Sequence, residues 1–437
     1  MTGTLRAAGF PEDAVRTRAR EGAASAFPPL PGYGAALYGA GALPAPASAG
    51  DAPDALDALD ALRLVPPVLM PGRLEKLIDL GREPHPTDVD LTTRIGGLTS
   101  PLPLYVSALG STQVASADLA NALSRQAGRL GIPMVIGENI VPSRGFGRLP
   151  GAGHDDRTLH VRIREYLAEL PDGVGGIAVQ QSTEDADAEV WNLVYSDPGT
   201  RPLLDSGRLA FELKVGQGAK PGLGGMTVLP AELAAATAER FAVEPAFGPD
   251  ADHVLRCASP GTFTTEILRQ QIRMMRNNYP RARVWVKLPP GRDVREAART
   301  AWDSGADAVT VDGAEGGSGW APRAFLDHVG LPLSECLLRL APGDDCLLAS
   351  GRMHDGARAA KALALGARAV GLGRAAFLAV DEDPQEGLAR LVDSLAVELR
   401  LLISALGKYA PAELDHEDLW PLPVDAPDPT PLVEERG

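Results

Sequence analysis

The chain has 437 residues, of which 45% are hydrophobic and 23% charged, as in ordinary globular proteins. Its formal net charge of −15 argues against nucleic acid or anionic membrane partners, because both require a basic surface. Its three cysteines, Cys257, Cys336 and Cys346, lack CxxC spacing, which argues against a disulfide framework and against a metal or iron–sulfur site. Without a long apolar run or a signal-like N-terminus, the sequence predicts a cytoplasmic protein.

The two ends of the chain differ in composition from the middle. Residues 1–64 are rich in Ala, Pro and Gly and include a short Asp-Ala-Leu repeat, which predicts an extended or loosely packed arm. Residues 411–437 include a proline-rich tail that we expect to be only partly ordered. The main domain is therefore predicted at residues 65–410, and neither end suggests a function of its own.

Short apolar runs rich in Val, Ile or Leu recur through the main domain. The runs cover residues 103–109, 133–138, 176–182, 211–215, 284–288, 308–313, 346–350 and 369–373. Continuous apolarity is typical of parallel strands buried on both faces, and helix-forming segments such as "DVREAARTAWDSGA" lie between the runs. This pattern predicts an α/β fold, a (β/α)8 TIM barrel rather than a doubly wound sheet. The long connection at about 216–283, after the fourth strand, predicts an insertion over the C-terminal face of the barrel.

Two glycine-rich loops follow the seventh and eighth predicted strands. They read "ASGRMHDG" at 349–356 and "GLGRAA" at 371–376, and Arg352 and Arg374 would add positive charge there. In a barrel these adjacent loops form the usual phosphate site, because glycines admit close approach to backbone N–H groups and helix N-termini are partly positive. The alternative is that the glycines only permit tight turns.

Polar side chains occur at or near the ends of the apolar runs. Lys287 lies within "VWVKL", where burying an ammonium group is costly unless an anion meets it. It would either pair with a structural carboxylate or face an electron-rich ligand in the barrel mouth. The other polar residues of this kind are Glu138, Gln180, Gln181, Glu212, Lys214 and Asp312. Together they predict a polar mouth of the kind that a cofactor site requires.

Four segments resemble the FMN-binding synthase domain of glutamate synthase and its stand-alone relatives. They are "GQGAKPGLGGM", "VKLP", "VDGAEGGSGWAPRAFLDHVGLP" and "SGRMHDGARAAKALALGARAVGLGRAAF". The resemblance implies FMN at the barrel mouth, with its phosphate on Ser350, Gly351, Arg352, Gly371 and Gly373. It also implies that Lys287 faces the N1/O2 edge of the ring, where a cation stabilises the reduced, anionic flavin. The remaining predicted cofactor residues are Ser107, Ala108, Leu109, Gly110, Gln181, Asp312, Gly316, Gly317, Gly319 and Arg374.

The stretch "FELKVGQGAKPGLGGM" at 211–226 begins as a buried strand and ends in a glycine-rich loop. By the same resemblance it would form one wall of the substrate space, with Lys214, Gln217 and Lys220 binding an anionic substrate. The alternative is a rigid structural loop with surface lysines.

The chain also departs from the glutamate synthase pattern. No cysteine follows Cys346, so the cluster that holds the iron–sulfur centre is missing, and the N-terminal arm has no cysteine for an amidotransferase. Leu223 stands where glutamate synthase has an acidic residue, and "CASPGTFTTEIL" replaces a stretch rich in proline and histidine. We therefore expect flavin chemistry on a different substrate.

The sequence thus predicts an FMN-dependent oxidoreductase acting on a small anionic substrate, such as an amino, imino or 2-oxo acid, by hydride transfer at flavin N5. Lys287, Glu138 and Glu212 are the predicted catalytic residues. The alternatives are a redox-neutral FMN-dependent isomerase or lyase, and a flavin subunit of a larger complex with a separate electron donor. The family resemblance also implies a homo-oligomer.

Overall fold

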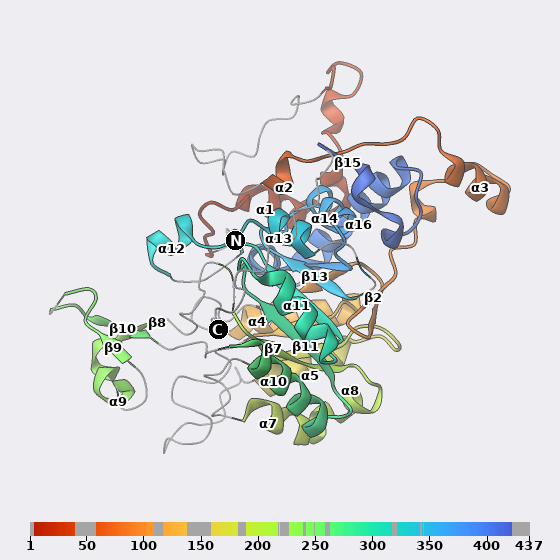
Figure 1. The fold of residues 1–437 in the computed structure, drawn as a ribbon. Helices are drawn as coiled ribbons and strands as arrows, with labels where there is room; N and C mark the ends of the chain where they lie inside the picture. The colour runs from red at the N-terminus through yellow and green to blue at the C-terminus, as the bar shows by residue number, and fades with distance from the viewer. Residues whose placement is uncertain are drawn as a thin grey trace, which may run out of the picture.

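The computed structural model describes residues 4–39, 58–108, 117–137, 159–181, 189–216, 218, 227–238, 242–248, 250–257, 263–316, 321–340, 343 and 345–421. Within these residues a closed barrel of eight strands forms the centre of the molecule, and helices surround it (Figure 1). No helix in this part of the chain has both the length and the apolar character needed to cross a membrane.

The barrel strands are all parallel and follow one another in chain order, with the last strand closing on the first. They are β4 (Leu104–Val106), β5 (Met134–Ile136), β6 (Ile177–Gln181), β7 (Leu209–Lys214), β11 (Arg283–Leu288), β12 (Ala308–Asp312), β13 (Leu347–Ser350) and β14 (Ala369–Leu372). Each overlaps one of the eight predicted apolar runs, so the predicted TIM barrel is confirmed.

The barrel interior is apolar at the end where the strands begin. Side chains alternate between the two faces of a strand, and the inward-facing ones here belong to Val135, Ala178, Ala210, Trp285, Ala308, Leu348 and Ala369. The antiparallel hairpin of β2 (Thr93–Ile95) and β3 (Leu98–Ser100) packs Ile95 and Leu98 against this layer. The indole Nε1 of Trp285 donates a hydrogen bond to the carbonyl of Gly96 at 3.0 Å. Because side chains fill this end of the barrel, a ligand site can open only at the C-terminal ends of the strands.

Helices between and after the strands cover the outside of the barrel, except the short α12 (Arg323–His328), which has no buried residue. The covering helices are α4 (Ala117–Leu130), α5 (Leu159–Glu169), α7 (Val190–Ser196), α8 (Arg201–Asp205), α10 (Thr265–Asn278), α11 (Val294–Asp303), α13 (Leu333–Leu340), α14 (Gly356–Ala364), α15 (Arg374–Glu382) and α16 (Gly387–Ala405). Side-chain caps start two of them: Thr264 accepts a hydrogen bond from the N–H of Ile267, and Asp355 accepts one from the N–H of Arg358.

Part of the N-terminal arm is a packed helix, where its composition predicted extended or loosely packed chain. Helix α1 (Glu12–Glu21) lies against α15 and α16, with Val15 and Ala19 fully buried. The other short elements of the arm are η1 (Gly22–Ala26), η2 (Leu30–Gly32) and α2 (Ala58–Ala61), and α3 (Pro71–Leu80) and η3 (Pro86–Asp88) follow it. Strand β1 (Arg63–Leu64) pairs with β15 (Leu419–Trp420), which joins the end of the arm to the start of the tail.

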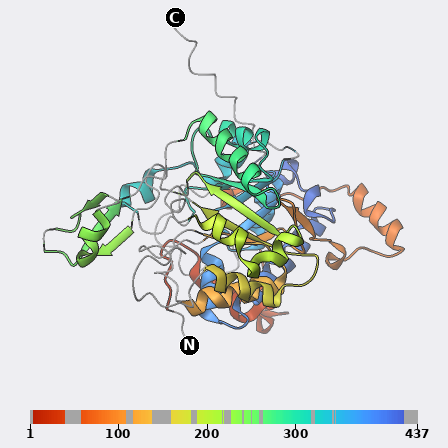
Figure 2. The same cartoon turned by 90° about the horizontal axis from the view of Figure 1, so that it is seen from below.

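The connection between β7 and β11 carries a small antiparallel sheet. Its strands are β8 (Thr227–Pro230), β9 (Ala242–Glu244) and β10 (His253–Cys257), and η5 (Ala231–Leu233) and α9 (Ala234–Ala238) lie between the first two. Figures 1 and 2 show this sheet standing apart from the barrel on one side, while α3 projects on the opposite side. The remaining short turns are η4 (Pro198–Thr200), η6 (Pro411–Glu413) and η7 (His416–Asp418).

Candidate functional site

The barrel interior becomes polar towards the ends of the strands. Lys287 on β11 and Asp312 on the neighbouring strand β12 meet at the barrel mouth, with Lys287 Nζ 2.9 Å from Asp312 Oδ2. Their side chains are 5% and 7% exposed, so the ion pair is nearly dry. Ser350 on β13 donates its hydroxyl hydrogen to Asp312 Oδ1. Lys287 therefore pairs with a carboxylate, that of Asp312, which is one of the two alternatives that its sequence position left open.

Glu212 lies deeper in the barrel, on β7. Gln180 Nε2 donates to one of its carboxylate oxygens, and Thr310 Oγ1 donates to the other at 3.2 Å. Burial raises the pKa of the Glu212 carboxyl, even though the positive charge of Lys287 and these two hydrogen bonds act to lower it. Glu212 is therefore a buried carboxyl that holds a proton more readily than an exposed glutamate.

A pocket opens above the Lys287–Asp312 pair at the C-terminal ends of the strands. Its lining residues are Phe10, Ser107, Ala108, Lys287, Asp312, Gly316, Ser350, Gly351, Arg352, Met353, Gly371, Gly373 and Arg374. Its volume is about 30 Å³, far below the roughly 300–1,000 Å³ of sites that enclose a whole drug-sized ligand. The described residues therefore outline one end of a site, where the cationic side chains of Lys287, Arg352 and Arg374 gather.

The backbone of the two glycine-rich loops is shaped for close approach. At Gly371 a Cβ atom would lie 2.7 Å from the Tyr105 ring and 2.9 Å from Ser107 Cβ, so only glycine fits between β14 and β4. At Gly373, the residue before α15, a Cβ atom would meet nothing within 4 Å. Arg352 has a φ of 53°, which a non-glycine residue rarely adopts and which is often found at ligand sites. Open space thus lies beside the backbone at the start of α15.

Buried ion pairs tie the loops after β12, β13 and β14 together. Arg358, which is 1% exposed, donates to Glu315 Oε1 at 3.1 Å and to Asp60 Oδ1 at 2.8 Å. Arg374 Nη2 donates to the carbonyl of Glu315 at 2.6 Å, and the Glu315 carboxylate accepts from the N–H of Leu333. Glu315 and Arg358 were not among the predicted site residues, although both lie inside the segments that resemble glutamate synthase.

Most of the predicted cofactor residues come together in this pocket. Those that line it are Ser107, Ala108, Lys287, Asp312, Gly316, Ser350, Gly351, Arg352, Gly371, Gly373 and Arg374. Outside the described residues lie Leu109, Gly110, Glu138, Gln217, Lys220, Gly317 and Gly319. Glu212 and Lys214 are buried on β7 and, two residues apart on one strand, share its inner face.

Gln181 is the described cofactor residue that the structure does not bring into the pocket. Its Oε1 accepts a hydrogen bond from the N–H of Trp191 on α7 at 3.4 Å. Because adjacent side chains on a strand point to opposite faces, Gln180 faces the interior and Gln181 faces the helices. The pocket instead includes Phe10 and Met353, and nothing in the sequence pattern pointed to Phe10.

Residues 171–382 match the family described as a conserved region in glutamate synthase. The archaeal glutamate synthase (NADPH) of Methanocaldococcus jannaschii is 34% identical over 180 residues, which are 39% of this chain and 34% of the relative. The archaeal-type glutamate synthase (NADPH) of Dehalococcoides mccartyi is 35% identical over 189 residues, 40% of this chain and 36% of the relative. The predicted family resemblance is confirmed for this region, and the chain spans about a third of the length of these relatives.

Solved structures share the barrel. A soluble mutant of (S)-mandelate dehydrogenase from Pseudomonas putida has a TM-score of 0.52 and 18% identity, over 83% of this chain and 88% of that chain. A flavocytochrome b2 variant with bound sulfite has a TM-score of 0.54 and 18% identity, over 87% and 84%. At this identity the likeness shows the fold alone.

Proposed function

We propose that this chain, whose residues 171–382 carry the conserved region of glutamate synthase, is an FMN-dependent oxidoreductase. The observation that carries the proposal is the pocket at the barrel mouth. Apart from Phe10 and Met353, all of its described lining residues are ones that the sequence resemblance assigned to FMN.

The pocket suits the phosphate of FMN in charge and in backbone shape. Arg352 and Arg374 line it, and Gly373 leaves open space at the N-terminus of α15, where the helix dipole favours negative charge. Ser350 also lines this pocket, while its hydroxyl hydrogen is donated to Asp312. These residues would hold the phosphate end of the cofactor.

Lys287 would supply positive charge beside the electron-accepting part of the site. Asp312 holds the Lys287 ammonium group at 2.9 Å, and Ser350 in turn holds Asp312, so the charge is fixed in place before any ligand arrives. When bound, FMN supplies hydride transfer at its N5 atom. The positive charge of Lys287 would favour the reduced, more electron-rich state of the cofactor in the barrel mouth.

The substrate in this proposal is a small anion of the amino, imino or 2-oxo acid class. The glutamate synthases named above support this class. Leu223 and the segment "CASPGTFTTEIL", which depart from the glutamate synthase pattern, support a substrate other than theirs. Glu212 is the described residue best suited to hold a proton, since burial favours its neutral form. A separate electron donor and a homo-oligomeric assembly remain predictions.

The test is to purify the protein, record its visible spectrum, and add NADH or NADPH without oxygen. We expect the two visible bands of oxidised flavin, release of FMN on denaturation, and bleaching by a reductant. In Lys287→Gln we expect bound FMN but a reduction rate lower by about 10²-fold, the usual effect of removing one preorganised charge.

Arg201→Gln is the control, because the Arg201 side chain is 75% exposed, and it should reduce like wild type. A colourless protein that cannot be reconstituted with FMN would refute the proposal. If the protein binds FMN and converts substrate without net consumption of reductant, it is an isomerase or a lyase.

A further inference from the structure

We infer that the N-terminal arm is part of the cofactor site, with Phe10 as a positioning residue that holds Arg374 at the phosphate end. The inference rests on the proposed binding of FMN at the barrel mouth. It gives a role to a segment whose sequence suggested none, and it predicts that arm docking and cofactor binding stabilise each other.

Phe10 is buried between the two glycine-rich loops. It is 2% exposed and lines the same pocket as Ser350 and Gly373. The guanidinium carbon of Arg374 lies 4.6 Å from the centre of the Phe10 ring, which is cation–π geometry. The Phe10 ring also contacts the His354 ring in a T-shaped arrangement, with ring centres 6.0 Å apart and planes at 73°. One side chain of the arm therefore contacts residues from the loops after β13 and after β14.

Ion pairs hold the arm on the far end of helix α15. Arg16, whose side chain is 9% exposed, lies 2.8 Å from Asp381 Oδ2 and 3.1 Å from Glu382 Oε2. Asp381 also accepts hydrogen bonds from the backbone N–H groups of Thr4 and Leu5, both at 3.0 Å. The arm is thus fixed to α15 on both sides of Phe10 along the sequence.

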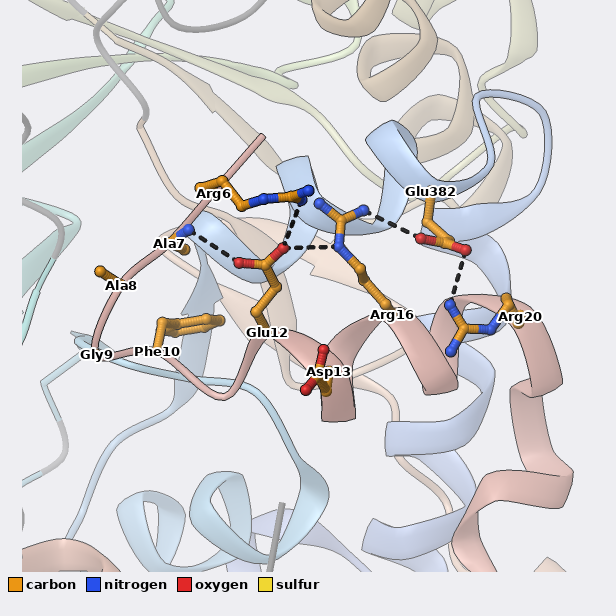
Figure 3. Close-up of a pocket in the computed structure, with 10 residues that line it drawn as sticks. All are labelled: Arg6, Ala7, Ala8, Gly9, Phe10, Glu12, Asp13, Arg16, Arg20 and Glu382. Atoms are coloured by element: carbon orange, nitrogen blue, oxygen red, sulfur yellow. Dashed lines mark hydrogen bonds and ion pairs between the residues drawn. The ribbon is translucent and has the colours of Figure 1, made fainter. Parts of the chain in front are cut away.

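Figure 3 shows how these charges are arranged within the arm. Arg6 and Arg16 both point to Glu12, while Arg16 and Arg20 both point to Glu382. They surround a second pocket of about 560 Å³, which Phe10 also lines. Phe10 therefore lines both this outer pocket and the pocket at the barrel mouth.

Helix α15 connects the two ends of this arrangement. Its first residue is Arg374, beside the proposed phosphate, and its last turn contains Asp381 and Glu382. The docked arm contacts the helix at both ends, so it fixes the position of the helix and of the Arg374 guanidinium. Coupling between two binding events is reciprocal, so bound FMN must stabilise the docked arm as much as the docked arm stabilises bound FMN.

The experiment measures FMN affinity by flavin fluorescence in the full chain. For Phe10→Ala we expect the Kd to rise at least about tenfold, and for Phe10→Leu, which keeps apolar volume but no aromatic ring, a smaller rise. Arg16→Gln, far from the mouth, should also raise the Kd because it loosens the arm. The matched control is Phe27→Ala, an arm residue that is 55% exposed, and it should bind FMN like wild type.

Limited trypsin digestion of the wild-type protein gives a second readout that does not depend on any variant folding. Arg16, Arg18 and Arg20 are cleavage sites on the arm, and FMN should slow cleavage there if docking and binding are coupled. If wild type binds FMN but the Kd of the Phe10 and Arg16 variants is unchanged, or FMN leaves arm cleavage unchanged, this inference is wrong and the proposed function stands. If wild type binds no FMN, both fail.

Discussion

Glu212 shows how a single residue combines stability and chemistry in this barrel. It is buried among other charged and polar groups, and desolvation raises the pKa of its carboxyl group above the ordinary glutamate value of 4.5. Gln180 and Thr310 both donate to it, which fixes its orientation. A carboxyl held in this way binds a proton more tightly than an exposed glutamate does, at a cost in stability whenever it must ionise.

This cost predicts how the stability of the Glu212→Gln variant, relative to wild type, changes with pH. In the window between 4.5 and the raised pKa, the folded protein binds more protons at this site than the unfolded chain, so wild-type stability falls as pH rises through it. Glutamine does not titrate. We therefore expect the variant to gain stability relative to wild type as pH rises from 4.5 through the raised pKa, measured by urea unfolding. The exposed Glu244→Gln should show no such trend, and a gain at Glu212 that does not vary with pH would contradict the raised pKa.

At the level of elements, the strands were predictable and the contacts between loops were not. Continuous apolar runs are typical of strands buried on both faces, so each barrel strand could be located from the position of its apolar run in the sequence. The choice between Gln180 and Gln181 depends on which residue of the strand faces inward, and a continuous run hides that alternation. Phe10 could not be placed because its partners, His354 and Arg374, lie at the other end of the chain.

Arg358 pairs with Glu315 in the loop after β12 and with Asp60 on α2, and breaking these pairs should be costly. Arg358→Met would remove the Arg358 cation from the Glu315 carboxylate, which is 7% exposed. We expect a loss of about 3–5 kcal/mol in unfolding free energy, measured by urea denaturation.

Two further variants test the origin of that loss. Arg339→Gln removes a half-buried pair within one helix turn and should cost less than about 1 kcal/mol. Adding Glu315→Gln to Arg358→Met should restore part of the stability, since the unpaired charge is then gone. Purely additive losses would mean that the two side chains do not interact.

On the scale of the whole molecule, segments far apart in the sequence pack together around the barrel. The arm helix α1 packs on α15 and α16, and β1 at the end of the arm pairs with β15. The small sheet of β8, β9 and β10 is different, because Figures 1 and 2 show it apart from the barrel. Stability and cofactor binding should therefore depend on the arm and not on this sheet.

Replacing the small sheet tests that division. Thr227 pairs with Arg256 in antiparallel register, so the two ends of the segment lie about 5 Å apart and a short Gly-Asn turn can join them. We expect the variant lacking residues 228–255 to fold, to unfold at nearly the same temperature, and to bind FMN with a Kd within about twofold of wild type. The measurements are thermal unfolding and flavin fluorescence. Loss of FMN from a folded variant would mean that the sheet supports the barrel mouth, and the insertion would then belong to the cofactor site together with the arm.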